Sequence, residues 1–276
     1  MLPNTDPLAD SAPPRHAIES DDEEDEFNPL PHPTSETSPT HADVRIMPDN
    51  LPKKRPLVVF AGNVAEYTAR GIAHSLGELT AAVYVNDIET GQVFTPAFTK
   101  ALVLVSEATA RLPLWAMYPY AIAILAETEP TARTILDAYA LPAYISAHDE
   151  PPLAPPIRYL CNGAPPPTTA HAELFAPPNM IQDTAAALLA CRDVPGVLAL
   201  LPAPHIPPPA PKSIVHTWDE GGSYGDEAAW SASTMSSALA LLFGDAAPTW
   251  DAAAATKHHL MRGHARRTDA DDGMYI

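Results

Sequence analysis

Leu57-Val58-Val59-Phe60-Ala61-Gly62-Asn63 is the stretch from which the fold can be worked out. A short apolar run that stops at a glycine is typical of a buried strand. Asn63 can cap a helix over Val64–Leu76, which has apolar residues at helical spacing and is ended by Gly77. A second strand is expected at Ala81–Val85. The stretch therefore predicts one strand–helix–strand unit with a right-handed crossover.

Outward from this unit, the sequence continues to alternate between strand and helix patterns. Two of the predicted strands, Ala101–Val105 and Ala121–Leu125, are apolar throughout, as expected for inner strands covered on both faces. The other predicted strands are Val93–Thr95, Ile157–Cys161, Val197–Leu201 and Ile214–Trp218. The other predicted helices are Thr131–Tyr139, Met180–Arg192, Glu227–Phe243 and Trp250–Met261.

Alternating strands and helices indicate an α/β layer architecture. The short strands predicted between 81 and 125 follow one another without helices, so part of the sheet should be antiparallel. We therefore predict a single α/β domain with a mixed, mostly parallel sheet flanked by helices. A proline-bounded apolar stretch, Leu112–Tyr120, is expected either to pack on the core or to form a partner surface.

The ends of the chain differ from this domain in composition. The net charge is −18; residues 1–50 hold 12 acids and 2 bases, giving −10, and residues 51–276 hold 22 acids and 14 bases, giving −8. We predict a disordered acidic and proline-rich arm at 1–55, the α/β domain at 56–262 and a flexible tail at 263–276. Ser20 precedes three acids, a pattern that suits an acid-directed kinase.

Composition also excludes several classes of function. An acidic chain is repelled by phosphate backbones and anionic membranes, so neither nucleic acid nor a membrane is expected as a partner. Two cysteines, Cys161 and Cys191, make no disulfide framework and no four-ligand zinc site. The start lacks the pattern of a secretory signal, which places the protein in the cytoplasm or also in the nucleus.

Two patterns imitate catalytic or metal sites. Gly221-Gly222-Ser223-Tyr224-Gly225 matches a nucleophile elbow, but Asp219 and Glu220 beside it oppose the negative charge that forms at a serine nucleophile. The partners it would need lie downstream, at Asp245 or Asp251 and at His258, His259 or His264. Neighbouring His258 and His259 point to different faces of a helix, so a basic helix end explains the histidines better than a metal does. We predict no enzyme, no metal and no cofactor.

The most specific feature is the end of the sequence, Met274-Tyr275-Ile276, which follows a polar segment. An apolar residue, a tyrosine and a free carboxylate suit capture of a C-terminus in a pocket. Tyr275 would insert its ring and use its hydroxyl as a hydrogen-bond partner, Met274 would fill an apolar slot, and the Ile276 carboxylate would pair with a lysine. Such hydrophobic–tyrosine–X tails resemble those by which proteasome regulators and assembly chaperones enter pockets between α-subunits of the 20S core particle.

Three parts of the chain together resemble the fungal form of the first member of the heterodimeric proteasome assembly chaperone. They are the block from Pro13 to Leu30 around the acidic run, the opening Val58–Asn63 of the α/β domain, and Met274-Tyr275-Ile276. Residues 140–215 do not align with that family, so its dimerisation surfaces cannot be transferred to this chain.

The resemblance implies a non-enzymatic chaperone that pairs with a second, related chaperone and binds the α-ring during assembly of the core particle. Two alternatives remain open. An activator or adaptor would use the same tail on mature particles, and a serine hydrolase would use Ser223.

Overall fold

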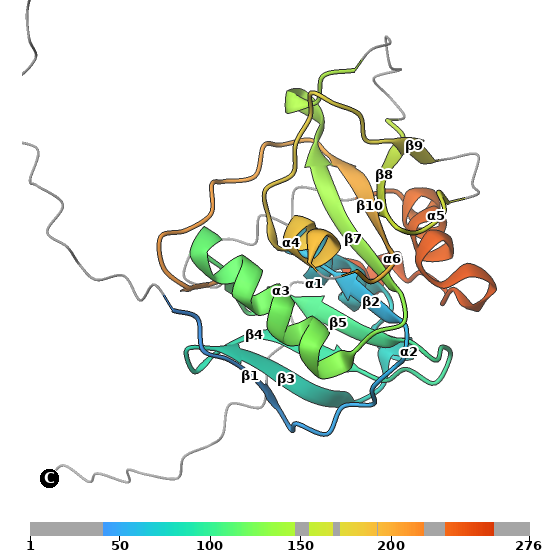
Figure 1. Ribbon diagram of the computed structural model, residues 1–276. Coiled ribbons are helices and arrows are strands. Elements are labelled where there is room, and N and C mark those ends of the chain that lie inside the picture. The colour runs from blue at the N-terminus through green and yellow to red at the C-terminus, as the bar shows by residue number, and fades with distance from the viewer. Residues whose placement is uncertain (1–40, 147–154, 168–171, 192, 218–229, 257–276) are drawn as a thin grey trace, which may run out of the picture. The chain divides into compact units, whose positions relative to one another are not determined.

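The computed structural model describes residues 41–146, 155–167, 172–191, 193–217 and 230–256. These residues contain a nine-stranded sheet with the order β1-β3-β4-β5-β2-β7-β10-β8-β9 and a two-stranded sheet of β11 and β6 (Figure 1). The strands are β1 Val44–Met47, β2 Leu57–Phe60, β3 Leu79–Val85, β4 Ile88–Phe94, β5 Leu102–Ser106, β6 Ala110–Arg111, β7 Arg133–Ala140, β8 Ile157–Asn162, β9 Ala172–Leu174, β10 Gly196–Ala203 and β11 Val215–His216. The α-helices are α1 Gly62–Gly71, α2 Ala73–Leu76, α3 Leu114–Thr128, α4 Thr184–Ala190, α5 Ala232–Phe243 and α6 Ala252–Ala255.

The centre of the large sheet is parallel. β5, β2, β7 and β10 run in the same direction, and β2 and β5 are fully buried along their length. β1, β3 and β4 continue from β5 with antiparallel pairing, β8 pairs antiparallel with β10, and β9 adds a parallel edge. The predicted fold class, a mixed sheet flanked by helices, is confirmed, and the predicted antiparallel part is the β3-β4-β5 meander.

Helices cover both faces of this sheet because alternate side chains of each strand point to opposite faces. Leu57 and Val59 join the cluster that contains α3 and α4, whereas Val58 and Phe60 join the cluster that contains α1, α5 and α6. Figure 1 shows α3 and α4 side by side on one face of the strands. The strands between these two layers are therefore apolar on both faces, as their sequence predicts.

Two elements were predicted with the wrong secondary structure. Ala121–Leu125 belongs to helix α3, and Thr131–Tyr139 is mostly strand β7. A short apolar run does not distinguish a strand from a buried helix, and here the apolar pattern extends over the 15 residues of α3, which is too long for an inner strand. β7 is a strand because it pairs with β2 on one side and β10 on the other, and this tertiary pairing overrides its local preference.

The predicted boundary of the arm at residue 55 is also wrong. Val44–Met47 forms β1, which pairs with β3, and Ala42 and Leu51 are buried in the core. Every second residue of β1 is half-buried. A strand of four residues is not stable alone, so β1 is stabilised by its pairing with β3 at the edge of the sheet. Residues 42–51 therefore belong to the α/β domain. Residues 1–40 and 257–276 lie outside the described residues.

The first strand and helix follow the prediction with changes in detail. Ala61, not Asn63, precedes the first turn of α1, and no side chain caps it; the predicted helix is divided into α1 and α2 at Ile72. β2 and β3 are not neighbours, because β5 and β4 lie between them. Gly62 has φ +56°, and a Cβ atom there would lie 2.7 Å from Asp137 Oδ1, so the turn requires glycine.

Candidate functional site

The tail residues Met274, Tyr275 and Ile276 lie outside the described residues, as does Ser223. The structure does describe the element that leads toward the tail, helix α6, after which only Thr256 is described. None of the described helices combines the length and the apolar character needed to cross a membrane.

Helix α6 is fixed to α1 by its first residues. The Asp251 backbone N–H donates to Gly71 O at 2.9 Å, and the Asp251 carboxylate accepts from the N–H groups of Ala253 and Ala254 at 2.9 and 3.0 Å. The Trp250 ring lies over Gly71, where a Cβ atom would come within 2.0 Å of it. Asp251, considered above as a partner of a serine nucleophile, is therefore the N-cap of α6.

The described residues before Ser223 do not form the central-sheet strand that a nucleophile elbow requires. β11, which lies in the strand predicted before Ser223, pairs with β6 in the small sheet and not with the described strands of the large one. A nucleophile elbow needs a strand of the central sheet that leads directly into the turn. This arrangement disfavours a hydrolase that uses Ser223.

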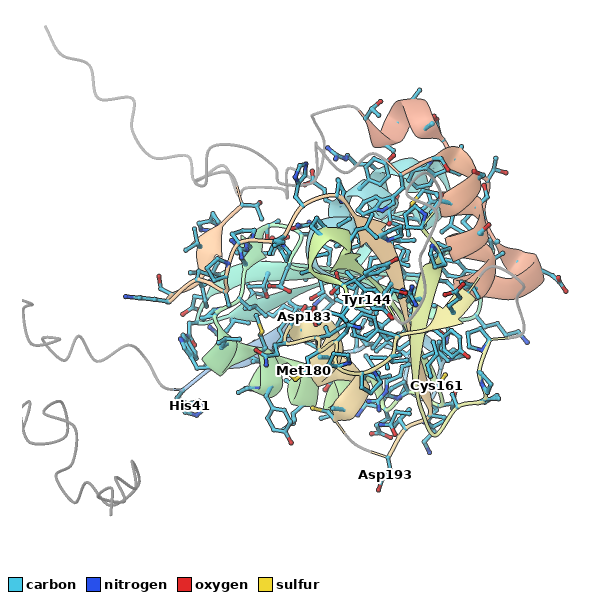
Figure 2. The ribbon with its side chains drawn as sticks, turned by 90° about the horizontal axis from the view of Figure 1, so that it is seen from above. His41, Tyr144, Cys161, Met180, Asp183 and Asp193 are labelled. Carbon is cyan, nitrogen blue, oxygen red and sulfur yellow. The ribbon has the colours of Figure 1, made fainter. Side chains whose placement is uncertain are left out.

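A cavity of about 690 Å³ lies at the carboxyl ends of β2, β5 and β7. This is the side of a parallel sheet on which α/β proteins usually bind ligands. Gly62 and Asn63 after β2, Glu107 after β5, Asp137 on β7 and Asp183 before α4 all line it. Tyr144, Met180 and Asp183, which are labelled in Figure 2, also line this cavity.

Three carboxyl groups line the cavity. Asp137 is only 5% exposed, whereas Glu107 and Asp183 are partly open. Each accepts hydrogen bonds from the backbone: Asp137 from Ala138 N at 2.7 Å, Glu107 from Leu112 N at 2.9 Å, and Asp183 from Ala186 N at 2.8 Å as the N-cap of α4. Glu107 thus bridges the turn between β5 and α3, Asp183 caps the start of α4, and Asp137 accepts its backbone hydrogen bond from the next residue of its own strand.

Burial raises the pKa of all three carboxyl groups. The pKa of Asp137 lies well above its usual range because of desolvation first, then the negative charges of Asp183 and Glu107 and a hydrogen bond with Asp183. The pKa of Asp183 and of Glu107 is raised mainly by desolvation, against the backbone hydrogen bonds that they accept. Asp137 and Asp183 therefore form a carboxyl pair in which the hydrogen bond favours the proton on Asp137.

Aromatic side chains form another wall of the cavity. Tyr139, Tyr144 and Phe175 contact one another with ring centroids 5.2–6.2 Å apart. The Arg158 guanidinium lies 3.9 Å from the Tyr144 ring centroid, and it also pairs with Glu173 at 3.4 Å. This cation–π contact packs the side chain of Arg158, which is 4% exposed, and holds β8 against the aromatic group.

The remaining wall is the proline-rich segment 207–210. Prolines donate no backbone hydrogen bond, so this segment is held through its carbonyl groups. Arg111 donates to the carbonyl oxygens of Pro208 and Pro209 at 3.1 and 3.0 Å, and Trp115 Nε1 donates to Lys212 O at 3.2 Å. β6 and the start of α3 therefore fix this edge of the cavity.

Chemically, the cavity offers a pair of carboxyl groups whose pKa values are raised by burial, and an aromatic wall. Within the described part of the chain, no group of three or more His, Cys, Asp or Glu side chains has the arrangement of a metal site. The backbone hydrogen bonds give Glu107 and Asp183 a structural role, in the turn after β5 and at the start of α4.

No family model matches this chain. No curated protein matches it either. Among solved structures, Pyrococcus furiosus PbaB, an archaeal proteasome activator, is similar at 11% identity and a TM-score of 0.42, over 58% of this chain and 80% of PbaB.

Two other structures show similar partial overlap. One is a protein of unknown function from Thermoplasma acidophilum, with 14% identity and a TM-score of 0.42 over 56% of this chain and 70% of that one. The other is Pyrococcus furiosus PbaA, an archaeal homolog of proteasome-assembly chaperone, with 10% identity and a TM-score of 0.38 over 58% of this chain and 76% of PbaA.

Sequence reasoning missed the group of carboxyl residues. Glu107 lies two residues after the predicted strand Ala101–Val105, and this position near a strand end could have indicated a site residue. Asp137 was hidden because its segment was predicted as a helix, which places it away from the strand ends. Asp183 carries the weak signal of an N-cap before the apolar run 184–190.

Proposed function

We propose that this chain is a non-enzymatic proteasome assembly chaperone that binds the α-ring of the 20S core particle through its last three residues, in the cytoplasm or the nucleus. The observation that carries the proposal is the sequence Met274-Tyr275-Ile276 after a polar segment. The family resemblance of the N-terminal block and of Val58–Asn63 supports it.

The chemistry of binding is the capture of a chain end. Met274 fills an apolar slot, the Tyr275 ring enters the space between two subunits, and the Ile276 carboxylate pairs with a lysine at the base of the pocket. This requires Ile276 to carry the free carboxylate, which an intact-mass measurement of the natural protein checks.

The chain has enough length to reach such a pocket from the α/β domain. Helix α6 is docked on α1, and the sequence continues for the 20 residues from 257 to 276. An extended chain of that length spans at most about 70 Å. In the proposal, the α/β domain rests on the ring surface while the tail enters the pocket.

A second, related chaperone is the proposed partner, as in the family that the chain resembles. If that partner carries a tail of its own, insertion of the first tail makes insertion of the second intramolecular, which raises the overall affinity without new contacts. A change in pocket shape as the ring matures would then release both tails.

Deletion of residues 274–276 and the substitution Tyr275→Ala test the proposal. Both changes should reduce co-purification of core-particle precursors by about tenfold or more, which corresponds to about 1.4 kcal/mol. Thr268→Ala, in the same segment, is the matched control and should bind as the unchanged chain does. Undiminished binding after the deletion would contradict the proposal.

A third variant tests the carboxylate. One glycine added after Ile276 moves the carboxylate away from the lysine and should weaken binding as the deletion does. Ring association that survives this addition would leave no role for the chain end.

The same assay separates a chaperone from an activator or adaptor. An assembly chaperone should recover more precursors than mature particles when both are supplied at equal concentration. Stronger binding to mature particles would favour an activator or adaptor that uses the same three residues.

A further inference from the structure

The outward face of α3 is apolar over its whole length. Leu114, Tyr118 and Ile122 are 63%, 58% and 36% exposed, and Ala126 is exposed as well. These residues are spaced four apart, so they form one stripe along the helix. The first charged residue of the helix is Glu127, near its last turn.

The opposite face of α3 is buried in the core, where it packs on the sheet and beside α4 (Figure 1). The helix is therefore apolar all round, a pattern typical of helices that are covered on every side. An apolar stripe of this kind on an otherwise strongly acidic protein indicates a contact surface.

We propose that the stripe Leu114–Tyr118–Ile122–Ala126 binds the same stripe of a second copy of this chain, with the two α3 helices antiparallel. The spacing of the stripe is symmetric about residue 120. A two-fold axis at that level sets Leu114 opposite Ala126 of the other copy, and Tyr118 opposite Ile122. A large side chain therefore faces a small one at each end, which allows the helices to approach closely.

Charge at the two ends of the stripe supports the same orientation. Lys212 is exposed beside the N-terminal half of α3, where its carbonyl oxygen accepts from Trp115 Nε1 at 3.2 Å. Glu127 lies at the other end of the helix. An antiparallel pair brings the lysine of each copy toward the glutamate of the other, whereas a parallel pair would place like charges together.

This inference goes beyond the proposed function because it involves no tail residue. Self-association through α3 is measured on the purified chain alone, without proteasome particles. Failure of one proposal therefore leaves the other intact.

Sedimentation of the purified full-length chain over a concentration series tests the proposal. We expect a monomer–dimer equilibrium, and Tyr118→Glu should raise its dissociation constant by about tenfold or more, because each dimer then buries two unpaired carboxylates. Leu174→Glu is the matched control: Leu174 is 55% exposed on the edge strand β9 and should leave the constant unchanged.

Three outcomes would overturn the proposal. A chain that stays monomeric up to about millimolar concentration has no such interface, since binding weaker than that corresponds to less than about 4 kcal/mol. If Tyr118→Glu and Leu174→Glu changed the dissociation constant equally, the dimer would not form through α3. A monomeric chain that binds a different protein through α3 would show that the occupant is not a second copy.

Cysteine cross-linking tests the orientation. In the antiparallel pair, the double variant Leu114→Cys/Ala126→Cys should form a covalent dimer on mild oxidation. The two positions are 12 residues apart on one helix, about 18 Å, so they cannot bridge within a chain. The single variant Leu114→Cys should remain uncross-linked, as should the unchanged chain with Cys161 and Cys191. Cross-linking of the single variant would indicate a parallel pair and contradict the proposal.

Discussion

At the scale of single residues, Asp137 is the most unusual position of the described chain. It lies on a central strand, it is 5% exposed, and its pKa is raised well above its usual range by desolvation and by neighbouring carboxyl groups. A raised pKa in the folded state means that the folded chain holds this proton more tightly than the unfolded chain does. The contribution of Asp137 to the stability of the folded state is therefore greatest at acid pH, where this side chain is protonated in both states.

We expect the stability contribution of Asp137 to fall as pH rises. The loss begins near the unfolded pKa, about 4, and continues up to the raised folded pKa. Asp137→Asn cannot ionise, and its amide can donate to Asp183. The melting temperatures of the variant and the unchanged chain should agree near pH 4, and the variant should melt higher at pH 8.

Thermal unfolding at a series of pH values makes this measurement, with Asp193→Asn as the control at an exposed position. The control should follow the unchanged chain at every pH. A constant difference between Asp137→Asn and the unchanged chain across the whole range would show that Asp137 does not titrate in this window.

Gly71 and Trp250 form a second contact that depends on single residues. A Cβ atom at Gly71 would lie 2.0 Å from the Trp250 ring, and that ring also stacks on Tyr67 at 5.3 Å. Gly71→Ala should displace the ring and destabilise the domain by about 1–3 kcal/mol. In the background of Trp250→Ala the same change should cost less, because the space is then free.

A double-mutant cycle on the free energy of unfolding measures this coupling. Additive effects of the two changes would show that the ring does not lie over Gly71 in solution.

At the scale of elements, β1 shows that the edge of the sheet extends beyond the predicted domain boundary. Val44–Met47 covers the outer side of β3, whose backbone groups would otherwise be unpaired. Ala42 and Leu51 on either side of it are buried.

A chain truncated to residues 41–276 should therefore be more stable than one truncated to 56–276. The shorter chain loses the β1–β3 pairing and exposes the edge of β3, so we expect a lower melting temperature and concentration-dependent aggregation. Thermal unfolding with light scattering compares the two. Equal melting temperatures would mean that β1 adds nothing to the domain.

At the scale of the whole molecule, the α/β domain and the proposed binding device occupy different parts of the chain. Among the described residues, which end at 256, the core clusters on the two faces of the sheet extend as far as Ala255, and the proposed contacts involve only residues 274–276. Deletion of these three residues should therefore leave the melting temperature nearly unchanged while it reduces ring association by about tenfold or more. Gly71→Ala should instead lower the melting temperature. A large loss of stability on tail deletion would show that the tail belongs to the fold.

The sequence predicted the central strands β2, β5 and β10 and most helices, because apolar runs such as 57–60 and 102–105 need cover on both faces wherever they pair. It did not predict the identity of 121–125 and 131–139, because a short apolar segment is compatible with both helix and strand until its neighbours are known. The carboxyl residues at the cavity were missed for the same reason, since Asp137 reaches the strand ends only if its segment is a strand.

The sequence by itself determined the α/β class, through the alternation of buried strands and helices, and it carries the chain-end motif on which the proposed function rests. Tertiary contacts were needed to show that α3 is a helix with an exposed apolar stripe, that β1 joins the sheet, and that Glu107, Asp137 and Asp183 meet at one cavity. The physical reason is that these features arise between segments far apart in the chain: strand pairing and helix packing choose among local conformations that are close in energy, and no short stretch of sequence contains both partners.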